Sequence, residues 1–183
     1  MFSIDIAIAH IFGAIPRVGI ISALIATIGT YLIYIIGVIA IVLWFREKDI
    51  KKRIYVVLIT IVVEVLSRGI ITETIRALWH RARPFVSLGF EPLISGKTSP
   101  SFPSGHTVFA VTLALCIFIL NKKWGWISLG LAGLIMVARV AAGVHWVSDV
   151  VGGALIALVV WAVTMSYIGP KQILKTEKKE PEA

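Results

Sequence analysis

Long apolar stretches alternate with short charged segments along most of the chain. A helix needs about 20 apolar residues to cross the hydrocarbon core of a bilayer. Stretches of about this length predict membrane-spanning helices at residues 19–45, 54–75, 104–120, 124–143 and 147–168. The third is the shortest, but it is apolar without interruption after His106. The pattern therefore predicts an all-α fold, an integral membrane helical bundle of about five transmembrane helices.

The beginning of the chain shows a separate, weaker pattern. Isoleucines recur there at helical spacing, at Ile4, Ile8, Ile11 and Ile15. Asp5 and His10 lie off this apolar stripe, and Gly13 and Pro16 are expected to end the helix. The segment over residues 1–18 is too short and too broken to span, so we expect an amphipathic helix in the membrane interface. It lacks a basic leading segment, so we expect no cleavable signal peptide.

Composition agrees with a membrane protein. Hydrophobic residues make up 58% of the 183 residues, which is too high for an ordinary soluble domain. We expect one membrane domain over residues 1–170 and a polar, Lys/Glu-rich cytoplasmic tail over residues 171–183. The net charge of +8 comes from short clusters between the apolar stretches. Such clusters are typical of a protein whose partner is the lipid bilayer, and we expect no nucleic acid partner.

The basic clusters also set the expected orientation. Residues 46–53, the pair Lys122 and Lys123, and the tail fall on one side of a five-span topology. The positive-inside rule makes that side cytoplasmic. The N-terminus, the loop over 77–103 and the turn over 143–147 then share the other side. We expect a protein of the plasma (inner) membrane with its active site facing the extracytoplasmic side.

The first candidate motif, Pro103-Ser104-Gly105-His106, opens the third apolar stretch. Ser104 can cap the helix, and Gly105 lets the backbone approach a ligand closely. A helix N-terminus presents free N–H groups and the positive end of its dipole, which suit a phosphate oxygen. His106 could then protonate a leaving oxygen. By itself, the motif fits a capped helix with an interfacial histidine equally well.

The second candidate motif lies between the fourth and fifth stretches. Arg139 precedes Gly143, which is expected to end the fourth helix. His145 and Asp149 are four residues apart, so they share a face of a helical turn. The carboxylate can accept the Nδ1 proton and leave Nε2 free as a nucleophile. The alternative is a simple polar pair at a helix entry.

A third candidate cluster precedes both motifs. Arg76 and Arg83 offer forked donors for a phosphoryl group, and Arg81 could join them or face lipid headgroups. The alternative is a basic patch at the membrane edge. These arginines would repel a divalent cation, so we expect neither a metal nor a cofactor. The zinc or magnesium site that this argument disfavours would use His106, His145 and Asp149.

Three charged residues fall inside the second apolar stretch. Glu64 and Arg68 are four residues apart, which predicts an ion pair that compensates both charges within the membrane. Glu73 could support Arg68 or Arg76 in the same way.

Together, the three clusters resemble the signatures of the type 2 phosphatidic acid phosphatase superfamily over roughly residues 20–168. The matching residues are Arg76, Arg83-Pro84, Pro103-Ser104-Gly105-His106, Arg139, His145 and Asp149. The resemblance implies a metal-independent membrane lipid phosphatase in which His145 attacks phosphorus and forms a phosphohistidine. It implies that Asp149 orients His145 and that His106 is the acid for the leaving group and then activates water. The phosphoryl oxygens would be held by Arg76, Arg83, Ser104, Gly105 and Arg139.

Two positions depart from the usual signatures. Arg76 stands where the family usually has lysine, which keeps the charge but introduces a bulkier, forked group. Ala138 stands where a serine usually precedes the arginine, so one hydroxyl contact to phosphate is missing.

The short, outward-facing relatives that this chain resembles are undecaprenyl diphosphate phosphatases, which recycle the carrier lipid of cell wall biogenesis. Hydrolysis of undecaprenyl diphosphate to undecaprenyl phosphate is therefore the first expectation. Alternative substrates are phosphatidylglycerol phosphate, phosphatidate and lipid A 1-phosphate. Phosphotransfer to another lipid, or a non-catalytic transporter or scaffold, are alternative functions. Arg81 and Lys97 could bind the second phosphate of a diphosphate.

Overall fold

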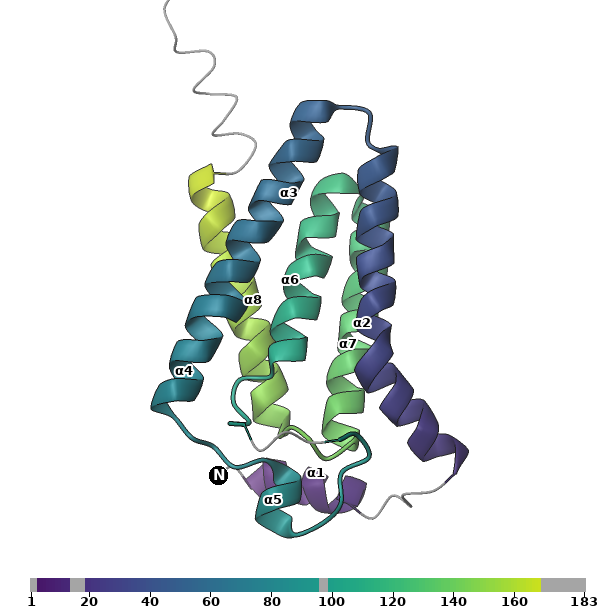
Figure 1. Cartoon of the computed structure of the whole chain (residues 1–183), viewed down its shortest axis with the longest axis vertical. Coiled ribbons are helices and arrows are strands. Elements are labelled where there is room, and N and C mark those ends of the chain that lie inside the picture. The colour runs from purple at the N-terminus through teal and green to yellow at the C-terminus, as the bar shows by residue number, and fades with distance from the viewer. Residues whose placement is uncertain (1–2, 14–18, 96–98, 169–183) are drawn as a thin grey trace, which may run out of the picture.

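Long apolar helices surround a shorter central helix. The computed structural model describes residues 3–13, 19–95 and 99–168. Within them, the helices long and apolar enough to cross a membrane are Ile20–Arg46, Ile50–Leu78, Lys122–Ala141 and Val147–Ile168. These are α2, the continuous run of α3, η1 and α4, then α7 and α8 (Figure 1). The predicted helical membrane bundle is confirmed.

The third predicted span is the helix at the centre of this bundle, α6 (Gly105–Leu120). It has 16 residues and packs against α2, α3, η1, α7 and α8. At a rise of about 1.5 Å per residue it is shorter than the hydrocarbon core. Because the other helices surround it, most of its side chains contact protein and not lipid. Its length is therefore not set by the thickness of the bilayer.

The outer faces of the long helices carry the exposed apolar side chains. Examples on α2 are Ile20, Tyr34 and Phe45, each more than 60% exposed. The interior is built largely from small or branched residues such as Ala110, Ala132 and Ala157, which let helices approach closely. This distribution is typical of a bundle whose solvent is lipid.

The second predicted span contains a feature that the apolar pattern does not predict. Between α3 (Ile50–Glu64) and α4 (Thr72–Leu78), the segment η1 (Val65–Ile71) is a π-helix. A π-helix bonds residue i to i+5, so it shifts the faces of the helix relative to an α-helix, and such segments occur frequently at functional sites. Arg68 lies in this segment.

One end of the bundle is closed by short elements. The helix α1 (Ser3–Gly13) lies across this end together with α5 (Pro84–Leu88), as Figure 1 shows. The predicted N-terminal helix therefore forms, and it ends at Gly13 as expected. Its inward residues are Asp5 and Ala9. Ile15, Pro16, Lys97 and the tail over 171–183 lie outside the described residues.

The turn after α7 (Lys122–Ala141) also lies at this end. Gly143 follows the helix with a φ of 73°, a left-handed conformation that favours glycine. Its N–H donates to the carbonyl of Val140 at 2.9 Å. The prediction that Gly143 ends the fourth span is confirmed, and the turn delivers His145 to the start of α8 (Val147–Ile168).

Candidate active site

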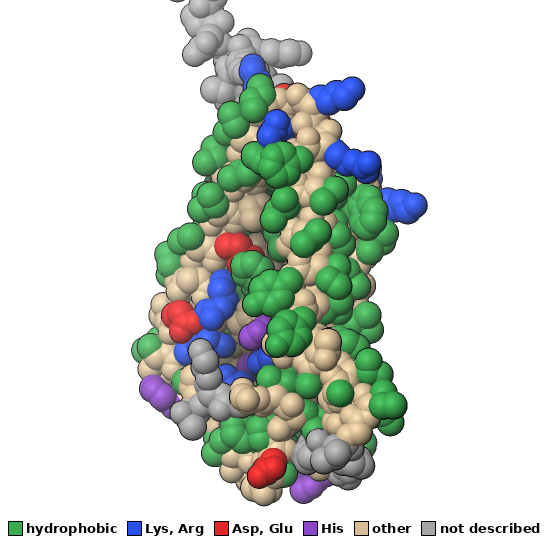
Figure 2. Space-filling view, turned by 45° about the vertical axis from the view of Figure 1, so that its right-hand side comes forward, with side chains coloured by type: hydrophobic (Ala, Val, Ile, Leu, Met, Phe, Trp, Pro, Cys, Tyr) green, Lys and Arg blue, Asp and Glu red, His purple; other side chains and the backbone are tan. Residues whose placement is uncertain are grey.

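A cavity of about 440 Å³ lies at the closed end of the bundle. Six of the eight residues singled out from the sequence line it, namely Arg76, Arg83, Gly105, His106, Arg139 and His145. The other lining residues are Thr30, Arg68, Ile94, Ser95, Ser99 and Val144. Figure 2 shows Lys or Arg and His side chains gathered in the lower half of the molecule. Ser104 and Asp149 are fully buried and do not line the cavity.

His145 is held between a carboxylate and a guanidinium group. Its Nδ1 lies 3.4 Å from Oδ2 of Asp149, and its Nε2 lies 3.4 Å from Nη1 of Arg83. Burial lowers the pKa of His145 to about 4, because the hydrogen bond to Asp149 opposes the burial only in part and Arg83 and Arg139 add positive charge. The imidazole is therefore neutral at neutral pH. With Nδ1 toward the carboxylate, the lone pair of Nε2 is directed to the cavity side and can act as a nucleophile.

Asp149 is the acceptor at the centre of a hydrogen-bond network. It accepts from the backbone N–H of Trp146 at 2.8 Å, from Nη1 of Arg81 at 2.6 Å and from the hydroxyl of Ser101. These bonds fix the carboxylate behind His145. Arg81 comes from the connection between α4 and α5, and Ser101 from the connection between α5 and α6, so their contribution could not be read from sequence spacing.

The start of α6 differs from the expectation in its details. Ser104 is the N-cap residue, but its side chain makes no capping hydrogen bond, so the predicted side-chain cap is wrong. Its N–H donates to the backbone carbonyl of Asp149 at 3.1 Å instead, and its buried hydroxyl has no partner. A contact between Ser104 and phosphate stays a prediction. His106, in the first turn of α6, does line the cavity.

Gly105 provides space at the same place. A Cβ atom built at this position would lie 2.6 Å from Nε and 2.9 Å from Cζ of Arg68. Real Cβ atoms do not approach that closely, so only glycine lets the Arg68 guanidinium lie against the N-terminus of α6. The group that lies against Gly105 is therefore an arginine of this chain, and the close approach of a ligand to this backbone stays a prediction.

The signature arginines are anchored through part of their donors. Arg83 donates from Nε to the Ser99 carbonyl and from Nη1 to the Val144 carbonyl, both at 2.9 Å. Arg76 donates from Nη2 to the Pro103 carbonyl at 2.9 Å. Nε of Arg139 is buried and has no hydrogen-bond partner. An anion in the cavity would meet fixed guanidinium groups with donors still available.

The predicted ion pair between Glu64 and Arg68 is wrong, because the two buried carboxylate oxygens of Glu64 have no hydrogen-bond partner. The support expected from Glu73 is confirmed, since Glu73 pairs with both Arg68 and Arg76. The π-helix explains the difference, because it places residues i and i+5 together. Arg81 pairs with Asp149 and with Asp5, at 2.6 and 2.7 Å, and its side chain is only 10% exposed. It is therefore not free to bind the second phosphate of a diphosphate.

This arrangement suits transfer of a phosphoryl group to a histidine. A neutral imidazole faces a cavity lined by arginines, and a second histidine, His106, lines the same cavity. Within the described residues, no three His, Cys, Asp or Glu side chains lie close enough together to hold a metal ion.

Comparison with known proteins agrees with this chemistry. Residues 54–173 match the family model of the PAP2 superfamily. The chain is 31% identical over 144 residues to the bacitracin transport permease protein BcrC of Bacillus licheniformis, covering 77% of this chain and 68% of that protein. It is 34% identical over 110 residues to an undecaprenyl-diphosphatase of Sulfolobus acidocaldarius, covering 58% and 53%. It is 27% identical over 143 residues to the undecaprenyl-diphosphatase BcrC of Bacillus subtilis, covering 77% and 72%.

Solved structures share the fold. A PAP2 type phosphatidylglycerolphosphate phosphatase from Bacillus subtilis superposes with a TM-score of 0.64 at 23% identity, covering 89% of this chain and 83% of that one. Aquifex aeolicus LpxE superposes with a TM-score of 0.67 at 24% identity, covering 91% and 97%. The family match extends over residues 54–173 and contains every residue that lines the cavity except Thr30. The chain therefore belongs to the PAP2 superfamily.

Proposed function

We propose that this protein is a membrane lipid phosphatase that hydrolyses undecaprenyl diphosphate to undecaprenyl phosphate through a phosphohistidine intermediate. The observation that carries the proposal is the neutral, carboxylate-bound His145 in an arginine-lined cavity. The substrate class is supported by the relatives named undecaprenyl-diphosphatase. The chain is a hydrolase by family, and its helices embed it in a membrane.

In the proposed mechanism, Nε2 of His145 attacks the terminal phosphorus. The bond between that phosphorus and the bridging oxygen breaks, and His106 gives a proton to the departing oxygen. His106 then takes a proton from water, which attacks the phosphohistidine. The P–N bond breaks, orthophosphate leaves and His145 is neutral again. Asp149 stabilises the positive charge on His145 during attack, and Arg76, Arg83 and Arg139 hold the phosphoryl oxygens.

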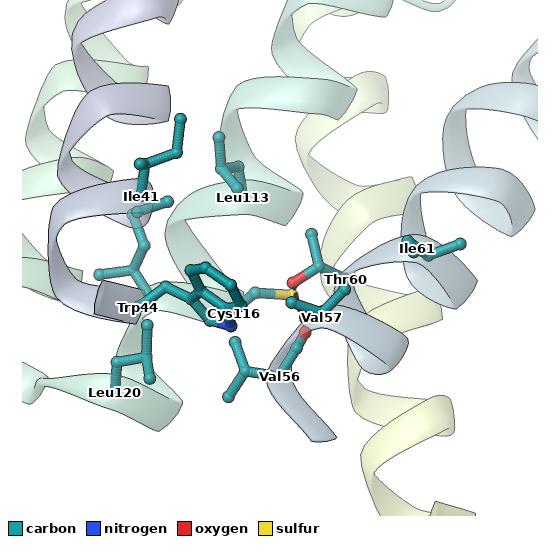
Figure 3. A pocket seen from close by; sticks show the side chains of 11 residues that line it. Ile41, Trp44, Val56, Val57, Thr60, Ile61, Leu113, Cys116 and Leu120 are labelled. Carbon is teal, nitrogen blue, oxygen red and sulfur yellow. Dashed lines mark hydrogen bonds between the residues drawn. The ribbon is translucent and has the colours of Figure 1, made fainter. Parts of the chain in front are cut away.

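Two further cavities with mainly apolar linings continue from this cavity along the bundle, which supports a lipid substrate. A second cavity of about 530 Å³ shares Arg68, Gly105 and His106 with the first. A third, of about 390 Å³, shares Ile41 and Leu113 with the second and lies between α2, α3 and α6 (Figure 3). Its lining is apolar apart from Thr60, Cys116 and the Trp44 indole. A polyprenyl chain could lie along these cavities with its phosphates at His106.

The distribution of basic residues supports an outward-facing site in the plasma membrane. The connection between α2 and α3 lies at the end of the bundle opposite to α1 and α5 (Figure 1). That connection and the start of α7 are lysine-rich, and the positive-inside rule assigns such segments to the cytoplasm. The cavity at the opposite end would then open toward the extracytoplasmic side.

The test is phosphate release by the purified protein in detergent with EDTA. The substrate panel contains undecaprenyl diphosphate, phosphatidylglycerol phosphate, phosphatidate and lipid A 1-phosphate. We expect the highest kcat/KM with the diphosphate and no release with the variant His145→Ala. Preference for a glycerolipid phosphate would replace the substrate assignment. Full activity of His145→Ala would contradict the mechanism, and lipid phosphate as a second product would indicate phosphotransfer.

A further inference from the structure

Arg68 lies where two cavities meet. One is the cavity of about 440 Å³ that holds the histidines, here called the phosphate cavity, and the other is the cavity of about 530 Å³ beside it, here called the apolar groove. Arg68 is the only arginine that lines both cavities within the described residues. It does not belong to the signature motifs, and its position depends on the π-helical turn of η1. The boundary between the two cavities, lined by Arg68, Gly105 and His106, is here called the neck. At the neck, Arg68 can reach the part of a substrate that joins the reacting phosphate to the lipid chain.

We infer that Arg68 binds the second phosphate of a lipid diphosphate, the one that stays on the lipid. This inference rests on the proposed function and assigns the residue that selects diphosphates over monophosphates. When the terminal phosphate lies at His145, the bridging oxygen lies toward His106 and the next phosphate lies toward the groove. Arg68 lines both cavities at that boundary, together with Gly105 and His106.

The geometry leaves donors of Arg68 available on the correct side. Its Nη1 donates to Glu73, while its other two nitrogens, Nε and Nη2, lie 2.6 and 3.1 Å from a Cβ built at Gly105. These nitrogens therefore lie beside the N-terminus of α6, where backbone N–H groups and the helix dipole also favour an anion. Arg68 and the helix terminus together form one side of the neck.

A phosphate can replace Glu73 as the partner of Arg68. The side chain of Glu73 is 51% exposed and it also pairs with Arg76, so it can keep one partner when an incoming phosphate takes the other. A half-exposed carboxylate contributes little binding energy to such a pair. A phosphate presents more charge and more acceptor oxygens than Glu73 and would compete with it effectively.

The charge of the cavity also fits a diphosphate. Four arginines line it, namely Arg68, Arg76, Arg83 and Arg139, and within the described part of the chain no carboxylate does. Three of them belong to the signature that holds the reacting phosphoryl group. The fourth charge stabilises the leaving group, because the bond to the bridging oxygen breaks with its electron pair going to a phosphate that Arg68 contacts.

The test compares farnesyl diphosphate with farnesyl monophosphate, which carry the same chain. For Arg68→Gln, we expect kcat/KM for the diphosphate to fall about 10- to 100-fold, the range of a lost charged hydrogen bond. The monophosphate should change less than about threefold, since it has no group at the neck. Where turnover of the monophosphate is slow, its competitive inhibition constant against the diphosphate gives the same comparison. Both substrates are measured on one sample, so loss of folded protein cancels in the ratio.

Two variants complete the design. Arg68→Lys keeps the charge and should recover part of the diphosphate activity. Arg46→Gln removes an exposed arginine at the last residue of α2, at the opposite end of the bundle, and it should leave both substrates unchanged. Equal losses on both substrates for Arg68→Gln would overturn the role inferred for Arg68 and would leave the proposed function in place. Failure of the unaltered protein to cleave any lipid diphosphate would contradict the proposed function instead.

Discussion

At the scale of single residues, the protonation of His145 determines whether the proposed nucleophile is active. Its pKa is lowered by burial to about 4, from an ordinary value of 6.5. As the pH falls through about 4, the imidazole gains a proton and loses the lone pair that attacks phosphorus. We therefore expect protonation of His145 to cause no loss of kcat/KM between neutral pH and about pH 5. Below about pH 5, kcat/KM should fall as His145 gains its proton.

The measurement is a profile of kcat/KM against pH for a lipid diphosphate in detergent. The matched variant is Asp149→Asn, which removes the negative charge that favours the protonated imidazole. It should lower the rate strongly and move the acid limb to lower pH. An acid limb centred near 6.5 that is unaffected in Asp149→Asn would show that His145 is solvated and not buried as the structure has it.

At the scale of secondary structure elements, α1 is joined to the active site through one carboxylate. Asp5 accepts from the N–H and the hydroxyl of Ser148 at 3.0 and 2.6 Å, and from Nη2 of Arg81 at 2.7 Å. Burial would raise the pKa of Asp5, but these contacts hold it below its ordinary value. Since Arg81 also binds Asp149, α1 supports the carboxylate that orients His145.

We expect Asp5→Asn to lower kcat about tenfold with little change in KM, because a charged hydrogen bond is lost without a change in the phosphate-lining residues. Thermal unfolding in detergent should show a loss of about 1–3 kcal/mol. The variant Asp49→Asn is the control, since Asp49 caps α3 at the opposite end of the bundle. Unchanged kcat for Asp5→Asn would mean that α1 covers the site without supporting it.

The elements also show what a sequence can and cannot predict. Apolar length predicts the spans, and Gly143 predicts the end of α7, because these depend on local chain properties. The spacing of His145 and Asp149 predicts their contact for the same reason. Asp5 and Arg81 lie far apart in the chain, so no local pattern predicts their ion pair. The sequence offers both Glu64 and Glu73 as partners of Arg68, and the choice of Glu73 depends on the π-helical segment, whose hydrogen bonding leaves no mark in the hydrophobic pattern.

At the scale of the whole molecule, orientation can be measured with the single native cysteine left in place. Cys116 is buried within the bundle, so it should give little background with a membrane-impermeant maleimide. Glu91→Cys places a thiol in the exposed loop at the site end, and Lys48→Cys places one in the exposed connection at the other end. In intact cells we expect labelling of the first and not of the second. The reverse result would place the active site in the cytoplasm.

The joined cavities make a prediction about chain length. Gly37 lines the groove beside His106, and a Cβ built there meets nothing within 4 Å. A side chain added at this position starts in open space, so we expect the indole of Gly37→Trp to occupy part of the groove. Each methylene kept out of an apolar site costs about 0.8 kcal/mol, so displacing two or three should lower kcat/KM for undecaprenyl diphosphate at least about tenfold. Dimethylallyl diphosphate, whose short chain ends near the neck, should be much less affected.

Gly130→Trp is the matched control for this experiment. Gly130 is also a helical glycine with open space around it, but it lies on α7 and lines neither the groove nor the phosphate cavity. It should leave both substrates unchanged, because its indole would face outward from the bundle. If Gly37→Trp and Gly130→Trp behaved alike, the lipid chain would not follow the groove. If only Gly37→Trp discriminated by chain length, the path from the histidines to the apolar cavity of Figure 3 would be the route of the lipid chain.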